Sequence, residues 1–227
     1  MDKKKKTRLL IAVCAMLFMI LVYFLFAIFV LKIPIFWKKT ITGKGTVGIV
    51  SVTIVPVCTF YIGPGWSLLS LCANATNKSV DGVFQNISYR YVMRWNTTRM
   101  EYDIYSPRAV NNPFDSLDVN ESYFVLDYSS EIFSVFGPPN SDMDIAMVQG
   151  WDAPSWPYLF ETNVTKYIDS AKHRYMMKWD LPGQEFDIYS PRAAQNPFTK
   201  IYKGEGQFIY AYLNHTLQYN KTYLFDP

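Results

Sequence analysis

An acid and an arginine recur in a motif that the sequence contains twice. Residues 101–114 read EYDIYSPRAVNNPF, and residues 185–198 read EFDIYSPRAAQNPF. Asp103 and Asp187 occupy the same place in the two copies, and an arginine follows each of them five residues later. Most glycoside hydrolases place two carboxyl groups on either side of the scissile bond. Glycoside hydrolysis is therefore the first chemistry that these residues suggest.

A structural role explains the motif better than catalysis does. A hydrolase does not need its carboxyl pair at two places with one spacing, whereas a duplicated core needs the aromatic, aliphatic and turn-forming residues that dominate the motif. We interpret Asp103 and Asp187 as residues that cap a turn or pair with a nearby arginine. His173 and His215 lack the spacing of metal ligands, and no P-loop, GxGxxG, GxSxG or CxxC motif is present. We expect no enzyme activity, no cofactor and no bound metal.

The motif lies inside a longer duplication with a shift of 84 residues. Residues 89–114 and 173–198 align without a gap and are identical at 15 of 26 positions. Further on, SYFVLDY at 122–128 aligns with GQFIYAY at 206–212. Agreement at this level indicates that one structural module is present in two copies.

The periodicity of the module predicts mostly strands. Tyr91, Met93 and Trp95 lie at every second position and so share one face of a predicted strand. This strand begins a hairpin, and a turn that contains a sequon leads to the returning strand EYDIY. Residues 64–71 read as an earlier strand, and residues 80–87 as a short amphipathic helix. The predicted order is strand, short helix, hairpin, loop and strand.

Proline and phenylalanine define how each copy leaves its hairpin. Pro107 and Pro191 cannot donate to a β-ladder, so the chain is expected to leave the sheet there. Phe114 and Phe198 are then expected to return to the core. Residues 45–57, GTVGIVSVTIVPV, are predicted to form an additional leading strand.

Four successive segments of the first copy resemble a known module: GWSLLSL, SVDGVF, the Tyr- and Trp-rich hairpin and SYFVL. This is the "GWNLISLP…W…GYWI" module, which occurs, often in tandem, in secreted surface proteins of archaea and some bacteria. The resemblance covers residues 64–128 well and residues 150–212 less well. Two prolines and an acid interrupt GWDAPSWPYLF at 150–160, so the first strand of the second copy is expected to be broken or displaced. The resemblance implies a mainly β, non-catalytic extracellular building block and no active-site residues.

The N-terminal region differs from the rest of the chain in charge and hydropathy. Residues 1–44 contain nine Lys or Arg and one acid, a net charge of +8, and residues 45–227 carry −5. Residues 9–31 are 23 residues without a charge, which as a helix reach about 35 Å, enough to cross a bilayer. We predict a cytoplasmic basic tail at 1–8 and a transmembrane signal-anchor helix at 9–37; the alternative is a cleaved signal peptide. An acidic body argues against nucleic-acid binding.

Sequons for N-glycosylation are abundant and all follow the apolar run. The eight Asn-x-Ser/Thr sites are Asn74, Asn77, Asn86, Asn96, Asn120, Asn163, Asn214 and Asn220. Chance gives about one or two sites in a chain of this composition. The body is therefore expected to be glycosylated and extracellular, on a single-pass protein of the cell membrane with a cytoplasmic N-terminus.

The cysteines fit an oxidising compartment without requiring one. Cys58 and Cys72 flank a predicted hairpin that turns at Gly63-Pro64-Gly65, and they form either a disulfide or two buried thiols. Cys14 lies in the apolar run.

The duplication divides the body into two predicted β-rich modules, residues 45–136 and 137–227, with GPPNSD at 137–142 between them. Trp151, Trp156 and Tyr158 lie where the second copy has diverged. Exposed aromatic rings bind sugars or protein partners, whereas buried rings only fill a core. We treat these three residues as candidates for partner or glycan binding, with core packing as the favoured alternative.

The sequence therefore predicts a membrane-anchored, N-glycosylated surface protein with a structural or adhesive ectodomain. Its expected partners are the lipid bilayer, other surface proteins or glycans, and copies of itself. A second hypothesis is a pilin-like filament subunit that assembles through the apolar helix or the leading strand. A third, less favoured one is a membrane-tethered carbohydrate-active enzyme.

Overall fold

The computed structural model describes residues 57–225, and these form a mainly β protein with 45% of residues in strands and 7% in helices. The expected β-rich fold class is confirmed. No helix within the described residues is both long and apolar enough to cross a membrane. The tail predicted at 1–8, the anchor at 9–37 and all of the leading strand except Val57 lie outside the described residues.

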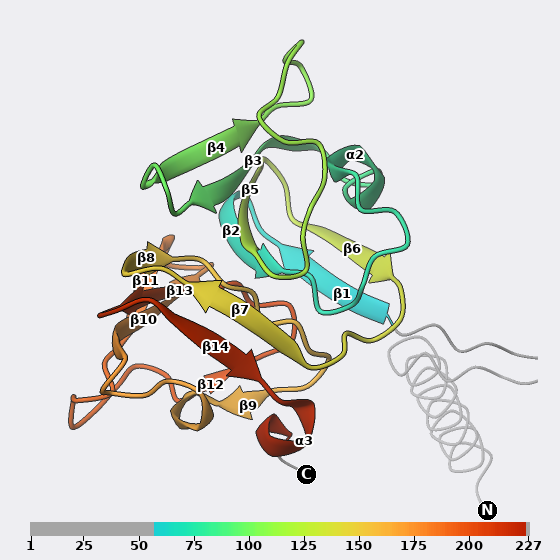
Figure 1. The fold of residues 1–227 in the computed structure, drawn as a ribbon. Helices are drawn as coiled ribbons and strands as arrows, with labels where there is room; N and C mark the ends of the chain where they lie inside the picture. The colour runs from blue at the N-terminus through green and yellow to red at the C-terminus, as the bar shows by residue number, and fades with distance from the viewer. Residues whose placement is uncertain (1–56, 226–227) are drawn as a thin grey trace, which may run out of the picture. The chain divides into compact units, whose positions relative to one another are not determined.

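The first half contains six strands and one short helix. These are β1 Val57–Ile62, β2 Gly65–Ser70, α2 Val80–Val83, β3 Tyr89–Asn96, β4 Glu101–Tyr105, β5 Ser122–Asp127 and β6 Glu131–Phe136. A four-stranded antiparallel sheet has the order β2-β5-β3-β4, and β1 pairs with β6 in a separate two-stranded sheet. Figure 1 shows the two sheets of this half side by side.

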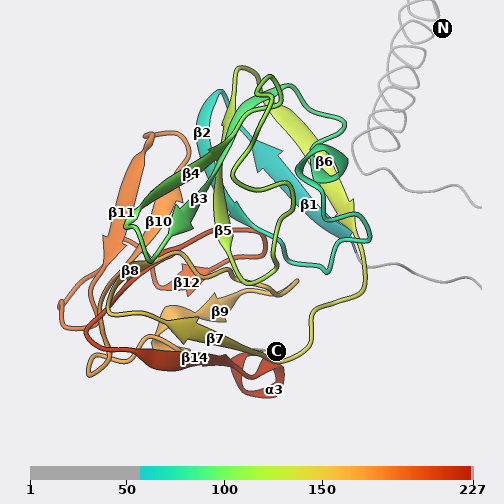
Figure 2. The same ribbon diagram turned by 45° about the horizontal axis from the view of Figure 1, so that its top comes forward.

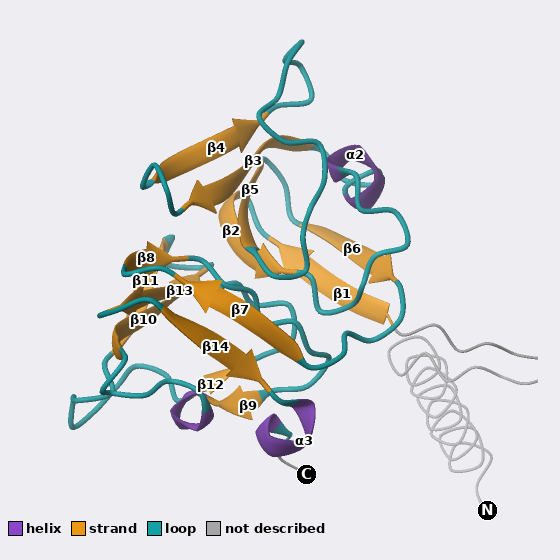
Figure 3. Cartoon of the chain, viewed as in Figure 1, coloured by secondary structure: helices purple, strands orange, loops and turns teal. Residues whose placement is uncertain are grey.

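The second half repeats this plan with small additions. Its elements are β7 Met143–Met147, β8 Gly150–Asp152, β9 Thr162–Asn163, η1 Val164–Lys166, β10 His173–Asp180, β11 Glu185–Tyr189, β12 Lys200–Ile201, β13 Phe208–Ala211, β14 His215–Tyr219 and α3 Lys221–Leu224. The four-stranded sheet has the order β8-β13-β10-β11, and β7 pairs with β14. β9 and β12 form an extra short ladder. Strands dominate both halves in Figure 3.

The structural repeat is longer than the repeat that the sequence shows. The pair β1–β6 corresponds to β7–β14, and β2 corresponds to β8, although these segments have little identity. A structural repeat with diverged ends is expected where only the inward-facing positions are constrained by packing.

Local sequence explains the details that recur in both halves. In β1, Cys58, Phe60 and Ile62 are buried and alternate with exposed residues. The hairpins β3–β4 and β10–β11 turn through a residue with positive φ at the same aligned position, Met100 at 56° and Gln184 at 53°. Two non-glycine residues therefore adopt the left-handed conformation because the turn requires it.

Two expectations about the first strands have different outcomes. The predicted hairpin between Cys58 and Cys72 is wrong: β1 and β2 flank the Gly63-Pro64-Gly65 turn, but they do not pair with each other. Each pairs instead with a strand 52 to 79 residues later, β1 with β6 and β2 with β5. The expected interruption of the second copy is confirmed, because β8 is only three residues long and ends just before Ala153-Pro154.

Candidate functional site

An aromatic interface joins the two halves through their four-stranded sheets. Its buried residues are Leu68, Phe124, Ala153 and Phe208, and the partly buried residues around them are Trp66, Met93, Trp95, Tyr102, Trp151, Met177, Trp179 and Phe186. Every first-half residue in this set has its aligned counterpart in the second-half set. The two sheets lie next to each other in Figure 2. The hairpin aromatics of the repeated motif therefore serve to join the halves.

Tryptophan side chains cross this interface in both directions. The Trp95 indole N–H donates to the Trp151 carbonyl oxygen at 2.8 Å, and the Trp179 indole N–H donates to the Trp66 carbonyl oxygen at 2.7 Å. Trp95 aligns with Trp179. Trp66 corresponds to Trp151, with a shift of 85 residues in this segment, because the two residues pair with the equivalent Leu126 and Tyr210. The two bonds are thus the same contact made twice, in opposite directions.

Backbone hydrogen bonds also cross between the halves in matched pairs. Ser122 N–H donates to the Ala153 oxygen at 2.8 Å, and its counterpart Gly206 N–H donates to the Leu68 oxygen at 3.2 Å. Residues 57–225 of both halves belong to one compact unit. The two halves are therefore packed together through shared main-chain hydrogen bonds.

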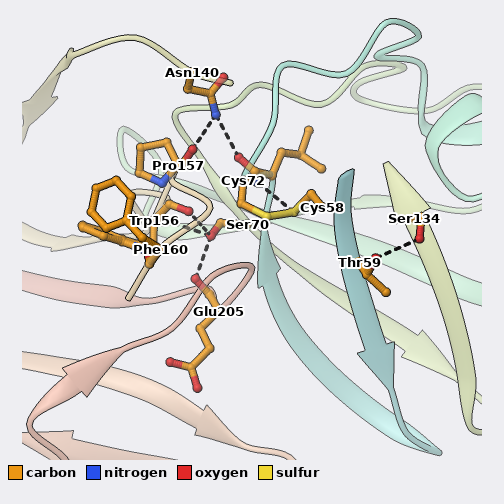
Figure 4. Close-up of a disulfide and its surroundings, with 11 residues drawn as sticks. Cys58, Thr59, Ser70, Cys72, Ser134, Asn140, Trp156, Pro157, Phe160 and Glu205 are labelled. Carbon is orange, nitrogen blue, oxygen red and sulfur yellow. Dashed lines mark hydrogen bonds between the residues drawn. A yellow bond between two sulfur atoms is a disulfide. The ribbon is translucent and has the colours of Figure 1, made fainter. Parts of the chain in front are cut away.

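A disulfide lies beside this junction. Cys58 and Cys72 are bonded, with their Cα atoms 5.6 Å apart, and both residues are fully buried. Nearby, the Ser70 hydroxyl donates to the carbonyl oxygens of Trp156 at 3.1 Å and Glu205 at 2.6 Å (Figure 4). The bond therefore fixes the end of β2 where the two halves meet.

Two of the three candidate binding aromatics are buried, so core packing, the favoured alternative, is confirmed for Trp156 and Tyr158. Trp156 is 0% exposed and Tyr158 is 1% exposed. The Trp156 indole N–H donates to the Phe160 oxygen at 2.8 Å, and the Tyr158 hydroxyl donates to the Tyr219 oxygen at 2.7 Å. Their polar groups are satisfied inside the second-half core, so neither ring can be offered to a partner.

Trp151 belongs to an accessible cluster that we call the second-half rim. The rim consists of Trp151, Arg174, Tyr175, Arg192, Tyr210 and Tyr212, of which the two arginines are exposed and the rings half-buried. The ring centroids of Trp151 and Tyr210 are 5.3 Å apart, and those of Tyr210 and Tyr212 are 6.4 Å apart.

Both arginines of the rim lie over tyrosine rings. The Arg174 guanidinium is 5.1 Å from the Tyr175 centroid and 6.0 Å from the Tyr210 centroid, and Arg192 is 5.4 Å from that of Tyr212. Contact with the Tyr175 hydroxyl raises the pKa of Arg174, so its positive charge is secure. Stacking of this kind holds a guanidinium in place, and Arg192 also donates from Nη2 to the Ser170 carbonyl oxygen at 3.0 Å.

The first half has a simpler version of this cluster. Arg90 lies 5.0 Å from the Tyr91 centroid and 6.0 Å from that of Tyr128. Leu126 takes the place of Tyr210, however, so the first half has no ring between Trp66 and Tyr128, the counterparts of Trp151 and Tyr212. Sequence reasoning named only Trp151 of the rim, because the members are scattered over four segments; the Leu126–Tyr210 difference in the aligned repeat was the signal that could have revealed the others.

The eight sequons divide by exposure. Asn77, Asn86, Asn214 and Asn220 are exposed, and Asn74, Asn96, Asn120 and Asn163 are half-buried. Asn96 ends β3 and does not stand at the tip of its hairpin, where we expected it. Its side-chain oxygen accepts from the N–H groups of Thr98 and Arg99 at 3.2 and 3.0 Å, which closes the turn.

The charged residues of the first copy of the motif form ion pairs or lie exposed. Asp103 pairs with Arg94 at 3.2 Å and with Arg99, while Arg108 is exposed. Burial alone raises the pKa of Asp103, but hydrogen bonds from Asn96 and Arg94 and the nearby arginine charges outweigh it, so its pKa is lowered. Asp103 therefore stays ionised and structural, as the interpretation of the motif expected.

One hollow brings two other carboxyl groups together. Glu121 and Asp152 both line a space of about 170 Å³ at the junction of the halves. Burial is the main cause that raises the pKa of Asp152. Small-molecule sites usually occupy roughly 300–1,000 Å³. The hollow is too small for an extended sugar substrate, and the Tyr123 hydroxyl already donates to Glu121 at 2.8 Å.

The two histidines meet in the second half, although their spacing did not predict it. Their Nε2 atoms are 2.9 Å apart. The Asp169 N–H donates to His173 Nδ1 at 3.0 Å, and His215 Nδ1 donates to the Leu213 oxygen at 3.0 Å. These partners require His173 to carry its proton on Nε2, which then donates to His215.

This arrangement opposes metal binding by the pair. A metal at His173 Nε2 would displace the proton to Nδ1, where it would face the Asp169 N–H. Among residues 57–225, no group of three or more His, Cys, Asp or Glu is placed to hold a metal ion. Burial first, and then His215, lower the pKa of His173 to about 4, so His173 is neutral near pH 7.

Comparisons with protein-family models, with curated protein sequences and with solved structures find no match to this chain. The resemblance to the tandem surface-protein module therefore stays a prediction. The function must be argued from the residues and the geometry of the chain itself.

Proposed function

We propose that the chain is a single-pass, N-glycosylated protein of the cell surface whose body binds a partner protein or glycan through the second-half rim. The observation that carries this proposal is the rim itself, where two stacked arginines and four aromatic rings stay accessible. Tyr, Trp and Arg are the residue types that dominate binding hot spots.

The rigidity of the body supports a binding role. The rim extends from β8, β10 and β13, and the matched hydrogen bonds between the halves fix these strands. Preorganised aromatic side chains lose little conformational entropy when a partner binds. Fixed arginine charges on a body of net charge −5 favour acidic groups on that partner.

The proposed location is supported by sequence features on both sides of residue 45. An uncharged run at 9–31 is long enough for a membrane span, and all eight sequons follow it. Four of those asparagines are exposed on the folded body. The filament hypothesis depends on residues 1–56, and mass spectrometry of the mature N-terminus in native membranes distinguishes it from an uncleaved anchor.

Binding through the rim can be tested with the full chain in proteoliposomes. These are applied to a glycan array and to cells of its source, and the bound amount is measured. Tyr210→Ala removes the central ring of the rim, and we expect roughly tenfold or greater loss of binding, since hot-spot truncations typically cost more than 1 kcal/mol. Leu126→Ala, at the aligned position of the first half, is the control and should bind like the wild type. Equal binding by all three proteins would contradict the role of the rim.

A further inference from the structure

The outer face of the β1–β6 sheet exposes four apolar side chains. Val57 is 37% exposed, Tyr61 62%, Ile132 69% and Phe136 57%. Val57 is paired with Phe136, and Tyr61 with Ile132, so the four residues lie on one face. Thr59 and Ser134 occupy the middle of the face and are joined by a hydrogen bond of 3.0 Å.

The fold does not require this face to be apolar. In the corresponding β7–β14 sheet, the outward positions are Asp144, Ala146, Thr216 and Gln218. The same structural surface is therefore polar in one half and apolar in the other. Exposed apolar side chains gathered on one sheet face often mark a surface that is covered in the working molecule.

A glycosylation sequon stands at one end of the apolar face. Asn77, Gln85, Ser134 and Phe136 are among the residues that line a hollow of about 170 Å³ beside β6. Ser134 and Phe136 belong to the outer face, and Asn77 approaches from the segment before α2. The hollow therefore connects the glycosylation site with the exposed ring.

The Asn77 side chain is held in one orientation. Its Oδ1 accepts from the Ser79 N–H at 3.0 Å and from the Ser79 hydroxyl at 2.8 Å. Its Nδ2 lies against Gly82, where a Cβ would collide with it. Gly82 also lines the hollow. The nitrogen that a glycan modifies is thus directed to this space, while the oxygen keeps its hydrogen bonds.

We propose that an N-linked glycan on Asn77 packs over Phe136 and covers the apolar outer face of β1–β6. In the modification, Asn77 Nδ2 loses a proton and forms a bond to the anomeric carbon of a lipid-phosphate-linked oligosaccharide, and the lipid phosphate leaves. The apolar C–H face of the first sugar then lies against the Phe136 ring, and its hydroxyl groups reach Ser134 and Gln85. The inference rests on the glycosylation in the proposed function and specifies its role at one site.

The test compares the full chain made with and without N-glycosylation, each in detergent or nanodiscs. Phe136→Ser is expected to lower the Tm of the glycosylated protein by about 2–4 °C, because a ring–sugar contact worth about 1 kcal/mol is lost. In the unglycosylated protein the same substitution should leave Tm unchanged or raise it slightly. Tyr128→Ser, which removes another exposed ring away from this hollow, should have the same effect in both forms.

Peptide mass spectrometry of Asn77 separates the failures. A modified Asn77 with equal Phe136→Ser effects in the two forms would overturn the packing but leave the glycosylated surface protein intact. An unmodified Asn77, with glycans on other sequons, would also overturn this inference alone. An unmodified asparagine at all eight sites would remove the proposed glycosylation as well. Dimers or bromolipid quenching at a label on Ile132→Cys in the glycosylated chain would assign the face to a second copy or to the bilayer instead.

Discussion

The two halves have matching residues where they face each other and different residues where they face outward. Phe124 and Phe208 occupy matched places in the interface, and the tryptophan hydrogen bonds repeat with nearly equal lengths. Outside the interface, the first half has an apolar β1–β6 face and a disulfide, and the second half has a polar face and a histidine pair. The duplicated core thus fixes the architecture, and each half has acquired its own features on the remaining surface.

Among the features that only one half has, the disulfide is expected to contribute most to the free energy of unfolding. Cys58 and Cys72 align with Met143 and Pro157, so the second half has no equivalent bond. Replacing both cysteines by alanine should lower the free energy of unfolding by about 3 kcal/mol, because the closed loop constrains the unfolded chain. Urea unfolding of the variant and the wild type measures the change. Unchanged wild-type stability after full reduction would show that the bond does not contribute.

The histidine pair should make the second half sensitive to acid. The pKa of His173 is lowered from 6.5 to about 4 in the folded state, so the unfolded chain binds more protons between these values. The contribution of neutral His173 to the free energy of unfolding is therefore fully present above about pH 7. It falls by about 2 kcal/mol as the pH decreases toward 4. Besides His215, the charged groups that act on His173 are Asp169, which favours its protonation, and Lys172, which opposes it.

His173→Tyr tests this difference, because it installs the residue that the first half has at position 89. Thermal unfolding from pH 8 to pH 4 should show a shallower loss of stability in the variant than in the wild type. Parallel curves for the two proteins would mean that carboxylates elsewhere cause the acid sensitivity.

The matched tryptophans give the smallest and most symmetric effect. Trp95→Phe and Trp179→Phe each remove one hydrogen bond to a main-chain oxygen across the interface and keep most of the ring. Each should destabilise the body by about 1–2 kcal/mol, by nearly the same amount, in chemical denaturation. A large inequality would show that the two sides of the interface are not energetically equivalent. The asymmetric neighbour is Gln184, whose side chain bonds to both the N–H and the oxygen of Trp66.

Sequence reasoning succeeded where the signal is local. Alternation predicted β3 and β4, and Phe114 and Phe198 return to the core as expected. The helix predicted at 80–87 forms only over Val80–Val83. Sequence reasoning failed for partners distant in sequence. Nothing near Cys58 indicates that β1 pairs with β6, because a strand next to a turn is equally compatible with a hairpin.

Burial of Trp156 and Tyr158 matches the favoured core-packing alternative, although the local pattern could not decide it. A Pro-rich aromatic stretch has the same sequence whether it lines a core or a binding surface, and only the packing of Tyr167 and Tyr219 around Trp156 decides between them. The histidine pair was not predicted for the same reason, because 42 residues separate the two rings that share a hydrogen bond.

The reciprocal tryptophan bonds have a consequence for the history of the chain. Each half carries both the donor and the acceptor of the contact, so a single half is complementary to a copy of itself, as the subunits of a two-fold symmetric dimer are. A gene that encoded one such half, duplicated and fused through a short connector, gives the present architecture directly. Fusion also removed the demand that both subunits be identical, and from that point one could change without the other.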